Sequence, residues 1–320
     1  MMQSIEGREL ITLDTFGAVV RGTYHRPPDA DADGYGQQRV GMLFLNSLSL
    51  PRAATGDSAV YWAESFAEGG YPSLRIDLPG LGDSDGTLPV ELLDFINAGG
   101  FASTASDKVK ELVERFNLSG VILVGHCAGV VSALFAAEKC VECRGLILMD
   151  PYFHLPQAVR PKVRQKLSDW ALHSTTGRIA SNLYDQLRQF YRRLRGSRPP
   201  VNANFALLKC WKDVASTGLP ILLLKAPARK ACGTKPRTGE FDYLQYVLKL
   251  AGRRSQVTVN FVEGTDHSFA NKVGRSAIRQ HTENWLKVHF PKAGETDPLA
   301  NRVRHETSTN EISVPTTSHS

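Results

Sequence analysis

The sequence predicts an α/β fold, in which a mostly parallel central sheet is covered by helices on both faces. Short apolar runs alternate with longer segments of helical periodicity through most of the 320 residues, which is the pattern of parallel strands joined by helices. The runs at 40–45, 121–124 and 220–225 contain almost no polar residue, as expected for strands buried on both faces.

Strands are predicted where short apolar runs are bounded by residues that favour turns. In chain order they lie at 10–13, 19–24, 40–45, 73–76, 121–124, 145–149, 220–225 and 257–262. A loop rich in Gly and Asp, at 27–38, separates the second strand from the third.

Helices are predicted where apolar residues recur at helical spacing between these strands. They lie at 58–68, 105–116, 130–137, 241–250 and 271–289. Gly69 and Gly70 end the first helix, and Thr104 or Ser106 is the expected N-cap of the second.

Residues 1–291 are expected to form one domain, which a helical cap inserted at about 154–215 interrupts. The tail at 292–320 is rich in Ser, Thr and Pro, so it is expected to be disordered. The insertion is strongly basic, because it contains Arg160, Lys162, Arg164, Lys166, Arg178, Arg188, Arg192, Arg193, Arg195, Arg198, Lys209 and Lys212. Such a charge run indicates either a solvated helical face or a surface that attracts an anionic ligand.

The most informative motif is the segment Gly125-His126-Cys127-Ala128-Gly129. It joins an apolar strand to a helix of small residues, which is the context of a nucleophile elbow. The tight turn lifts its central side chain above the sheet, at the N-terminus of the helix. Thiols in this position ionise readily, and the thiolate is the reactive form. Cys127 is therefore the predicted nucleophile.

Two further motifs follow the strands at 73–76 and 257–262. The first, at 77–84, reads DLPGLGDS and has Gly at the positions that a tight loop needs. The second, at 264–269, contains His267 in a loop between the last strand and the last helix. A general-base histidine is expected in that loop when a nucleophile elbow precedes it.

These three motifs resemble those of the α/β-hydrolases over residues 8–290. More narrowly, the chain is similar to the exosortase-A-system-associated hydrolases, some of which have a cysteine at the elbow. The similarity depends on 67–86, on the elbow and on 266–269, with the following helix that ends in Asn284-Trp285-Leu286. Pro79 stands where the family's DxRGxGxS loop usually has an arginine.

The resemblance implies an esterase or thioesterase that works through an acyl-cysteine. Cys127 would attack a carbonyl carbon and His267 would transfer the protons. The oxyanion would be bound by the N–H of Ala128 and by an N–H of Leu48 or Ser47. Two other functions remain open: an acyltransferase that uses the same intermediate, and an inactive binding protein.

The acid of the triad has two candidates. The family's usual position follows the strand at 220–225, but that loop has four cations before its first carboxylate, Glu240. Asp150, at the end of the strand at 145–149, is ranked ahead of Glu240. If they are not catalytic, Asp150 would cap a turn before Pro151, and Glu240 would be a carboxylate in the first turn of a helix. A thiolate–imidazolium pair needs this third residue less than a serine does.

Composition limits the partners and the compartment. The net charge is +6, and Arg229, Lys230, Lys235 and Arg237 add to the basic insertion. The expected partner is a small acyl substrate, which could be anionic or linked to a carrier such as coenzyme A, and not a nucleic acid. No apolar run reaches the roughly 20 residues of a membrane span, and no signal-like segment opens the chain, so a cytoplasmic location is expected.

The five cysteines are scattered, and the Cys140–Cys143 pair has no second ligand pair, so neither a metal nor a cofactor is expected.

Overall fold

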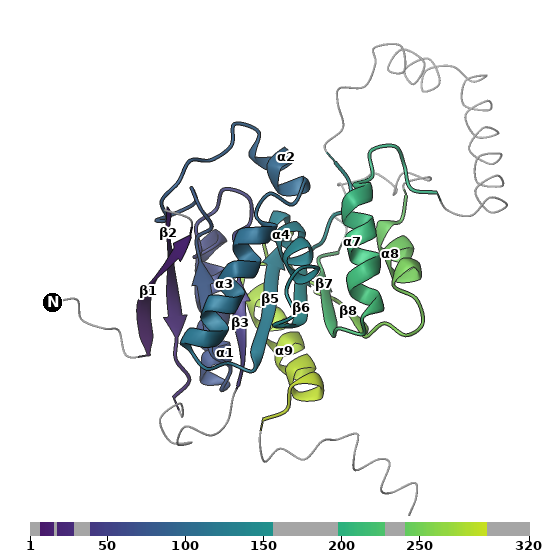
Figure 1. The fold of residues 1–320 in the computed structure, drawn as a ribbon. Helices are drawn as coiled ribbons and strands as arrows, with labels where there is room; N and C mark the ends of the chain where they lie inside the picture. Colours follow the sequence, from purple (N-terminus) through teal and green to yellow (C-terminus); the bar gives the residue numbers. More distant parts are fainter. Residues whose placement is uncertain (1–6, 16–17, 29–38, 156–197, 228–240, 293–320) are drawn as a thin grey trace, which may run out of the picture.

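The computed structural model describes residues 7–15, 18–28, 39–155, 198–227 and 241–292, and it confirms the predicted α/β fold (Figure 1). The described strands form an eight-stranded sheet in the order β1-β2-β4-β3-β5-β6-β7-β8. The pairs β1–β2 and β2–β4 are antiparallel, and the other pairs are parallel. The strands are β1 (Arg8–Thr15), β2 (Ala18–His25), β3 (Val40–Phe44), β4 (Ser73–Ile76), β5 (Gly120–His126), β6 (Cys143–Met149), β7 (Ile221–Lys225) and β8 (Val257–Phe261).

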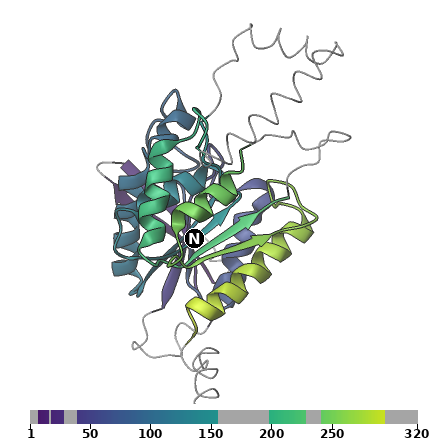
Figure 2. The same ribbon diagram turned by 90° about the vertical axis from the view of Figure 1, so that its right-hand side faces the viewer.

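Helices cover both faces of this sheet (Figures 1 and 2). One face is packed against α1 (Ser58–Glu68) and α9 (Lys272–His289), and a short 3-10 turn, Thr55–Asp57, precedes α1. The opposite face is packed against α2 (Leu92–Asn97), α3 (Ala102–Arg115), α4 (Ala128–Ala137), α7 (Phe205–Ser216) and α8 (Tyr243–Ala251).

The continuous apolar runs contribute alternate side chains to the two cores. In β5, Ile122 and Val124 pack in the same core as Trp62 of α1. Val121 and Leu123 point the other way and share a core with Trp211 of α7. Because successive side chains of a strand alternate between faces, a strand covered on both sides has to be apolar throughout.

Two helices differ from the sequence-based prediction. Helix α3 begins at Ala102, so the expected N-cap at Thr104 or Ser106 is wrong. Its N-cap residue is Phe101, which makes no side-chain capping bond but packs edge-on against Phe95 of α2, with ring centroids 5.0 Å apart. Tertiary packing therefore fixes this helix start, and the short helix α2 itself was not predicted.

The predicted insertion at about 154–215 falls into two parts. Residues 156–197, with most of its cations, lie outside the described residues, as does the predicted tail from 293 onward. Residues 205–215 belong to α7, which covers the sheet and buries Trp211 completely. The last helical turns of the predicted insertion are therefore part of the domain that contains the sheet.

The parallel strands bring the predicted motifs to one edge of the sheet. β3, β5 and β6 are neighbours that run in the same direction, so the residues that follow them lie at the same edge. β8 is parallel to β7 at the end of the sheet and delivers the loop with His267 to this edge. Ligands of open α/β sheets bind at this carboxyl edge.

Candidate active site

Cys127 lies in the turn between β5 and α4, in a backbone conformation that few residues other than glycine adopt. Its φ is 52° and its ψ is −114°. The Cys127 N–H donates to the carbonyl oxygen of Met149 at 3.0 Å, and the Cys127 carbonyl accepts from Val130 N–H at 3.1 Å. Conformations of this kind cost about 1–3 kcal/mol each and occur at functional sites, where the surrounding structure maintains them.

Close packing explains both glycines of the motif. A Cβ atom on Gly125 would lie 2.4 Å from the carbonyl oxygen of Gly129, and one on Gly129 would lie 2.8 Å from the carbonyl oxygen of Asn46. Larger residues would therefore displace the turn. The second contact also shows that the loop after β3 runs directly against the first turn of α4.

Asp150, His267 and Cys127 form a connected series of side chains. A carboxylate oxygen of Asp150 is hydrogen-bonded to Nδ1 of His267. Hydrogen bonds with Asp150 and with Cys127 raise the pKa of His267 to about 10. Of the two predicted acids, the structure brings Asp150 to His267, whereas Glu240 lies outside the described residues.

Lys225, the last residue of β7, binds the other carboxylate oxygen of Asp150. Burial alone would raise the pKa of Asp150, but hydrogen bonds from His267 and Lys225 hold it below its usual value. The Asp150 N–H also donates to Leu224 of β7, at 2.7 Å. Sequence reasoning missed Lys225, because its partner Asp150 lies 75 positions away along the chain.

His126, the neighbour of Cys127 in the chain, holds the loop that presents His267. Its Nε2 lies 2.7 Å from the backbone carbonyl oxygen of His267. A carbonyl oxygen only accepts, so Nε2 is the donor. Burial lowers the pKa of His126 to about 4, which keeps the ring neutral at neutral pH. Its ring also packs edge-on against Phe269, with centroids 5.8 Å apart.

The two candidate oxyanion residues of the β3 loop lie beside this turn. Ser47 is buried, and its carbonyl oxygen accepts from Leu50 N–H at 3.0 Å. Leu48 is partly exposed and has a positive φ of 52°. The loop is therefore a tight turn over the start of α4, which begins at Ala128.

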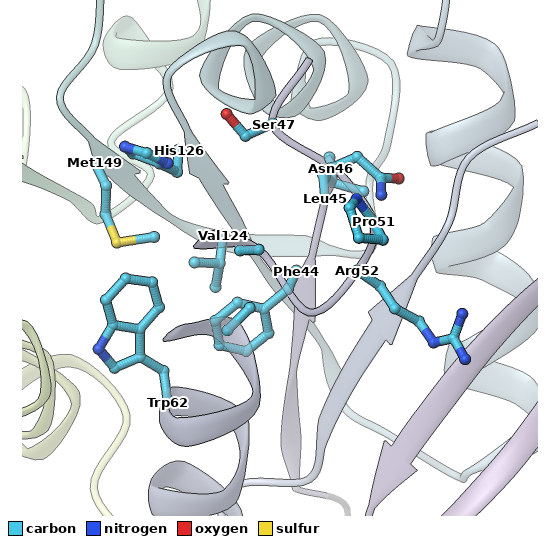
Figure 3. A pocket seen from close by; sticks show the side chains of 12 residues that line it. Phe44, Leu45, Asn46, Ser47, Pro51, Arg52, Trp62, Val124, His126 and Met149 are labelled. Atoms are coloured by element: carbon cyan, nitrogen blue, oxygen red, sulfur yellow. The ribbon is translucent and has the colours of Figure 1, made fainter. Parts of the chain in front are cut away.

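A small cavity lies under this loop (Figure 3). Its volume is about 20 Å³, which is room for about one water molecule. Ser47, Asn46 and His126 line its polar side, while Trp62 and Met149 belong to its apolar side. It is too small for an acyl chain, so it is not the substrate pocket.

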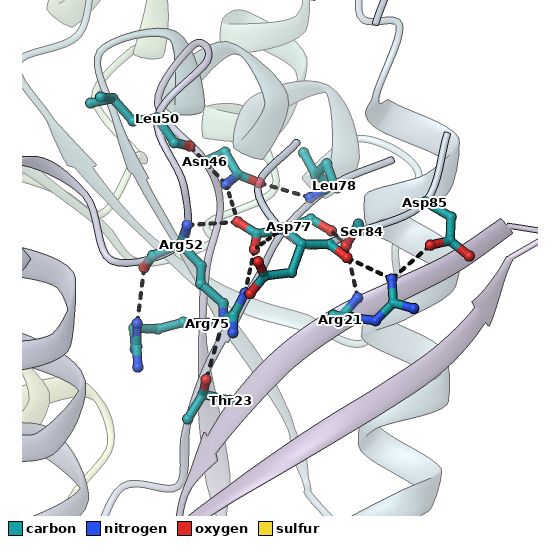
Figure 4. A network of polar contacts seen from close by, with 11 residues as sticks. Arg21, Thr23, Asn46, Leu50, Arg52, Arg75, Asp77, Leu78, Ser84 and Asp85 are labelled. Atoms are coloured by element: carbon teal, nitrogen blue, oxygen red, sulfur yellow. Dashed lines mark hydrogen bonds and ion pairs between the residues drawn. The ribbon is translucent and has the colours of Figure 1, made fainter. Parts of the chain in front are cut away.

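A buried charge network holds the β3 loop in place (Figure 4). The carboxylate of Asp77, which is fully buried, accepts from Asn46 Nδ2 at 2.9 Å, from Arg52 N–H at 2.6 Å and from Arg52 Nη1 at 2.5 Å. Asn46 in turn accepts from Leu78 N–H at 2.8 Å. The loop that carries Ser47 is thereby attached to the loop after β4 at both of its ends.

Arg52 provides a guanidinium close to the motif in which Pro79 replaces the family's arginine. It pairs with Asp83 of that motif at 2.7 Å, as well as with Asp77. Gly82 has a positive φ of 48°, and a Cβ atom there would lie 2.3 Å from the Asp77 carboxylate. The sequence alone gave no reason to single out Arg52, because its partners are distant along the chain.

Asp77→Asn is expected to destabilise the fold by about 3 kcal/mol, because it leaves a largely buried guanidinium without a full counter-charge. Asp213→Asn is the matched control, because Asp213 pairs with Lys209 on the exposed surface of α7. Exposed pairs contribute roughly 0–1 kcal/mol. Urea unfolding measures both changes. Equal and small losses for the two variants would show that the network does not hold the loop.

The described residues place further limits on the site. They contain no group of three or more His, Cys, Asp or Glu side chains that could hold a metal ion. Cys140, Cys143 and Cys210 are free and buried, and burial raises the pKa of Cys143 to about 12. Among these residues, no helix has both the length and the apolar character needed to cross a membrane.

Comparisons with known proteins agree with the fold. The model of the alpha/beta hydrolase family matches residues 42–274. A search of curated proteins finds no match. Solved structures with a similar fold include the alpha/beta hydrolase GrgF from Penicillium sp. sh18, with 18% identity over 89% of this chain and 99% of that one, and a TM-score of 0.54.

Two other similar structures are named for acyl-ester chemistry. The thioesterase domain from the curacin biosynthetic pathway is 16% identical over 88% of this chain and 99% of its own, with a TM-score of 0.52. The Pyrococcus furiosus esterase Pf2001 is 13% identical over 88% and 92%, with a TM-score of 0.54. At these identities the structures show a shared fold. Since the family model spans more than half of the sequence and includes the elbow and the His267 loop, this chain belongs to the alpha/beta hydrolase family.

Proposed function

We propose that this protein hydrolyses a carboxylic ester or thioester, with Cys127 as nucleophile, His267 as proton carrier and Asp150 as the acid that orients it. The observation that carries the proposal is the hydrogen bond between Asp150 and His267, together with the effect of Cys127 on the pKa of His267, at a strained turn before α4. This is the nucleophile–base–orienting group arrangement of covalent acyl transfer. The similar esterase and thioesterase folds are compatible with it.

In the first half-reaction, the Cys127 thiolate attacks the carbonyl carbon. The oxyanion accepts hydrogen bonds from Ala128 N–H and from the N–H of Ser47 or Leu48. When the tetrahedral intermediate collapses, the carbon–oxygen or carbon–sulfur bond of the substrate breaks. The His267 imidazolium donates its proton to the leaving alcohol or thiol, which leaves an acyl-Cys127 thioester.

In the second half-reaction, neutral His267 takes a proton from water as the water oxygen attacks the acyl-Cys127 carbonyl. Collapse of the second intermediate breaks the carbon–sulfur bond and releases the carboxylic acid and the thiolate. His267 keeps the proton, so the resting thiolate–imidazolium pair is restored. A His267 pKa of about 10 fits a resting state in which this imidazole is protonated at neutral pH.

Asp150→Asn is expected to lower kcat/KM by on the order of 10², less than the loss expected for a serine hydrolase because the thiolate needs less activation. The amide would still contact Lys225 and His267 but would carry no charge to stabilise the imidazolium. Glu240→Gln is the control and is expected to keep full activity. If both variants stay within a few-fold of the wild type, the enzyme works without either acid.

The direct test of this function is a screen of short p-nitrophenyl esters and acyl-coenzyme A thioesters, with the Cys127→Ala variant as the blank. Cleavage that depends on Cys127 supports the proposal, whereas equal rates in both proteins contradict it. Adding an alcohol or amine acceptor separates hydrolysis from acyl transfer, since a transferase forms the new ester or amide in place of the acid.

Two more specific predictions, the subfamily and an anionic substrate, rest on the sequence alone. The similarity to exosortase-associated hydrolases concerns the subfamily and stays a prediction. The basic residues that favour an anionic or carrier-linked substrate lie mainly in 156–197 and 228–240, outside the described residues. Their part in substrate binding also stays a prediction.

A further inference from the structure

A row of polar aromatic side chains begins two residues after Asp150 and crosses to two helices. The Tyr152 hydroxyl donates to Asn97 Oδ1, at the end of α2, at 3.2 Å. The Tyr152 ring lies 5.8 Å from the His154 ring, and the His154 ring lies 5.6 Å from that of Tyr243, at the start of α8. We call Asn97, Tyr152, His154 and Tyr243 the polar row.

Both ends of the polar row have a polar atom without a partner. Asn97 is only 4% exposed, and its Nδ2 has no hydrogen bond to any described residue. The Tyr243 hydroxyl is buried and lacks a partner in the same sense. A buried polar group left unpaired costs about 1–3 kcal/mol, so native proteins usually pair it with another protein group, a water molecule or a ligand.

The amide orientation of Asn97 does not remove this cost. In the orientation described, Oδ1 accepts from Tyr152 and Nδ2 is free. In the flipped orientation, Nδ2 would donate to the Tyr152 hydroxyl and Oδ1 would be free. Either way, one group of Asn97 is left without a partner among the described residues.

The backbone around the polar row is held firmly. Asn204, the N-cap of α7, donates from Nδ2 to the Asn97 carbonyl at 2.9 Å and from its N–H to the Phe153 carbonyl at 2.9 Å. The N–H of Leu155 donates to the Asn202 carbonyl at 2.7 Å. These bonds fix the residues that follow Tyr152 and the end of α2, so the backbone of Asn97 is held in position.

Helix packing and chain order connect the polar row to the elbow. α2 packs against α4, and the elbow forms the N-terminus of α4 (Figure 1). Tyr152 follows Asp150 after a single proline, in the same loop. Burial, and after it the charge of a Cys127 thiolate, raise the pKa of Tyr152 to about 12, so its hydroxyl stays a donor at neutral pH.

We infer that the polar row is a substrate subsite, in which Asn97 and Tyr152 bind an oxygen substituent on the acyl chain close to the reacting carbonyl. This inference rests on the proposed function. An oxo or hydroxyl group at the third carbon would pair the free group of Asn97, whereas a plain hydrocarbon chain would leave it unpaired. A site built around such a polar group discriminates against the analogue that lacks the oxygen.

The test compares N-acetylcysteamine thioesters of butyrate, 3-oxobutyrate and 3-hydroxybutyrate. The wild type is expected to prefer one oxygenated chain over butyrate by on the order of 10-fold in kcat/KM. The 3-oxo and 3-hydroxy arms show whether Asn97 donates or accepts. Asn97→Leu and Tyr152→Phe are expected to bring the ratio close to one, mainly by lowering kcat/KM for the oxygenated chain. Tyr246→Phe, on α8 but outside the polar row, is the matched control.

A binding arm keeps this test separate from that of the proposed function. The unreactive amides of the same three acids are titrated calorimetrically into Cys127→Ala, which has no nucleophile. The same preference in Kd, lost in the double variant Cys127→Ala/Tyr152→Phe, supports the subsite even if the thioesters are not cleaved. Equal affinity for all three amides, or a preference that Tyr152→Phe leaves intact, overturns it.

Discussion

Cys127→Ala is expected to lose turnover by on the order of 10⁴ or more, because the acyl-enzyme cannot form without the nucleophile. The fold is expected to persist, since alanine is smaller than cysteine and the turn depends on Gly125 and Gly129. The loss is measured as kcat/KM for a short ester, and circular dichroism checks the fold.

Cys127→Ser is the matched variant for this prediction. It keeps the size and position of the nucleophile but replaces a thiol with a far less acidic hydroxyl. The proposed mechanism uses a thiolate nucleophile, so the serine is expected to recover little of the lost activity. An alanine variant with wild-type rates would show that Cys127 does not react, and a serine variant with wild-type rates would show that the site does not require a thiol.

His267→Ala is expected to lower kcat/KM by on the order of 10³ or more, as removal of a triad base does. It removes the group that protonates the leaving alcohol or thiol and later activates water. Alkylation of Cys127 by iodoacetamide is expected to move to higher pH, because the imidazolium no longer stabilises the thiolate. An unchanged alkylation profile would show that the two side chains are not coupled.

The raised pKa of His267 also predicts a pH dependence of stability. The pKa of His267 in the folded state is about 10, above the ordinary histidine value of 6.5. The stabilisation of the fold by protonated His267 is therefore fully present below about pH 6.5 and is lost as the pH rises toward 10. In urea unfolding, His267→Gln is expected to lack this part of the decline, and parallel curves for the two proteins would contradict it.

The sequence predicted the parts of the fold that depend on local pattern. The run before Cys127 is apolar because β5 is covered on both faces, so periodicity alone located it. The elbow glycines were equally visible, since their packing against the turn admits no larger residue. The start of α3 was missed, because packing of Phe101 on Phe95 decides it and no polar cap marks it.

The sequence pointed to Asp150 and His267 of the candidate site, but not to Lys225 and His126, which hold them in place. Asp150 could be ranked ahead because it directly follows the carboxyl end of a predicted strand, and the structure brings it to His267. Lys225 and His126 were missed, because their contacts join residues that are 75 and 141 positions apart. Such long-range partners follow from strand order, which a single sequence does not specify.

The most direct test of the account is the mass of the intact protein after rapid quenching with an activated ester, followed by peptide mapping. An acyl adduct on the peptide that contains Cys127, absent from Cys127→Ala and removed with time in water, is the predicted result. In His267→Ala, any adduct that forms is expected to persist, because water is no longer activated. Turnover without an adduct on Cys127, or an adduct on another residue that accounts for the turnover, would contradict the proposed mechanism.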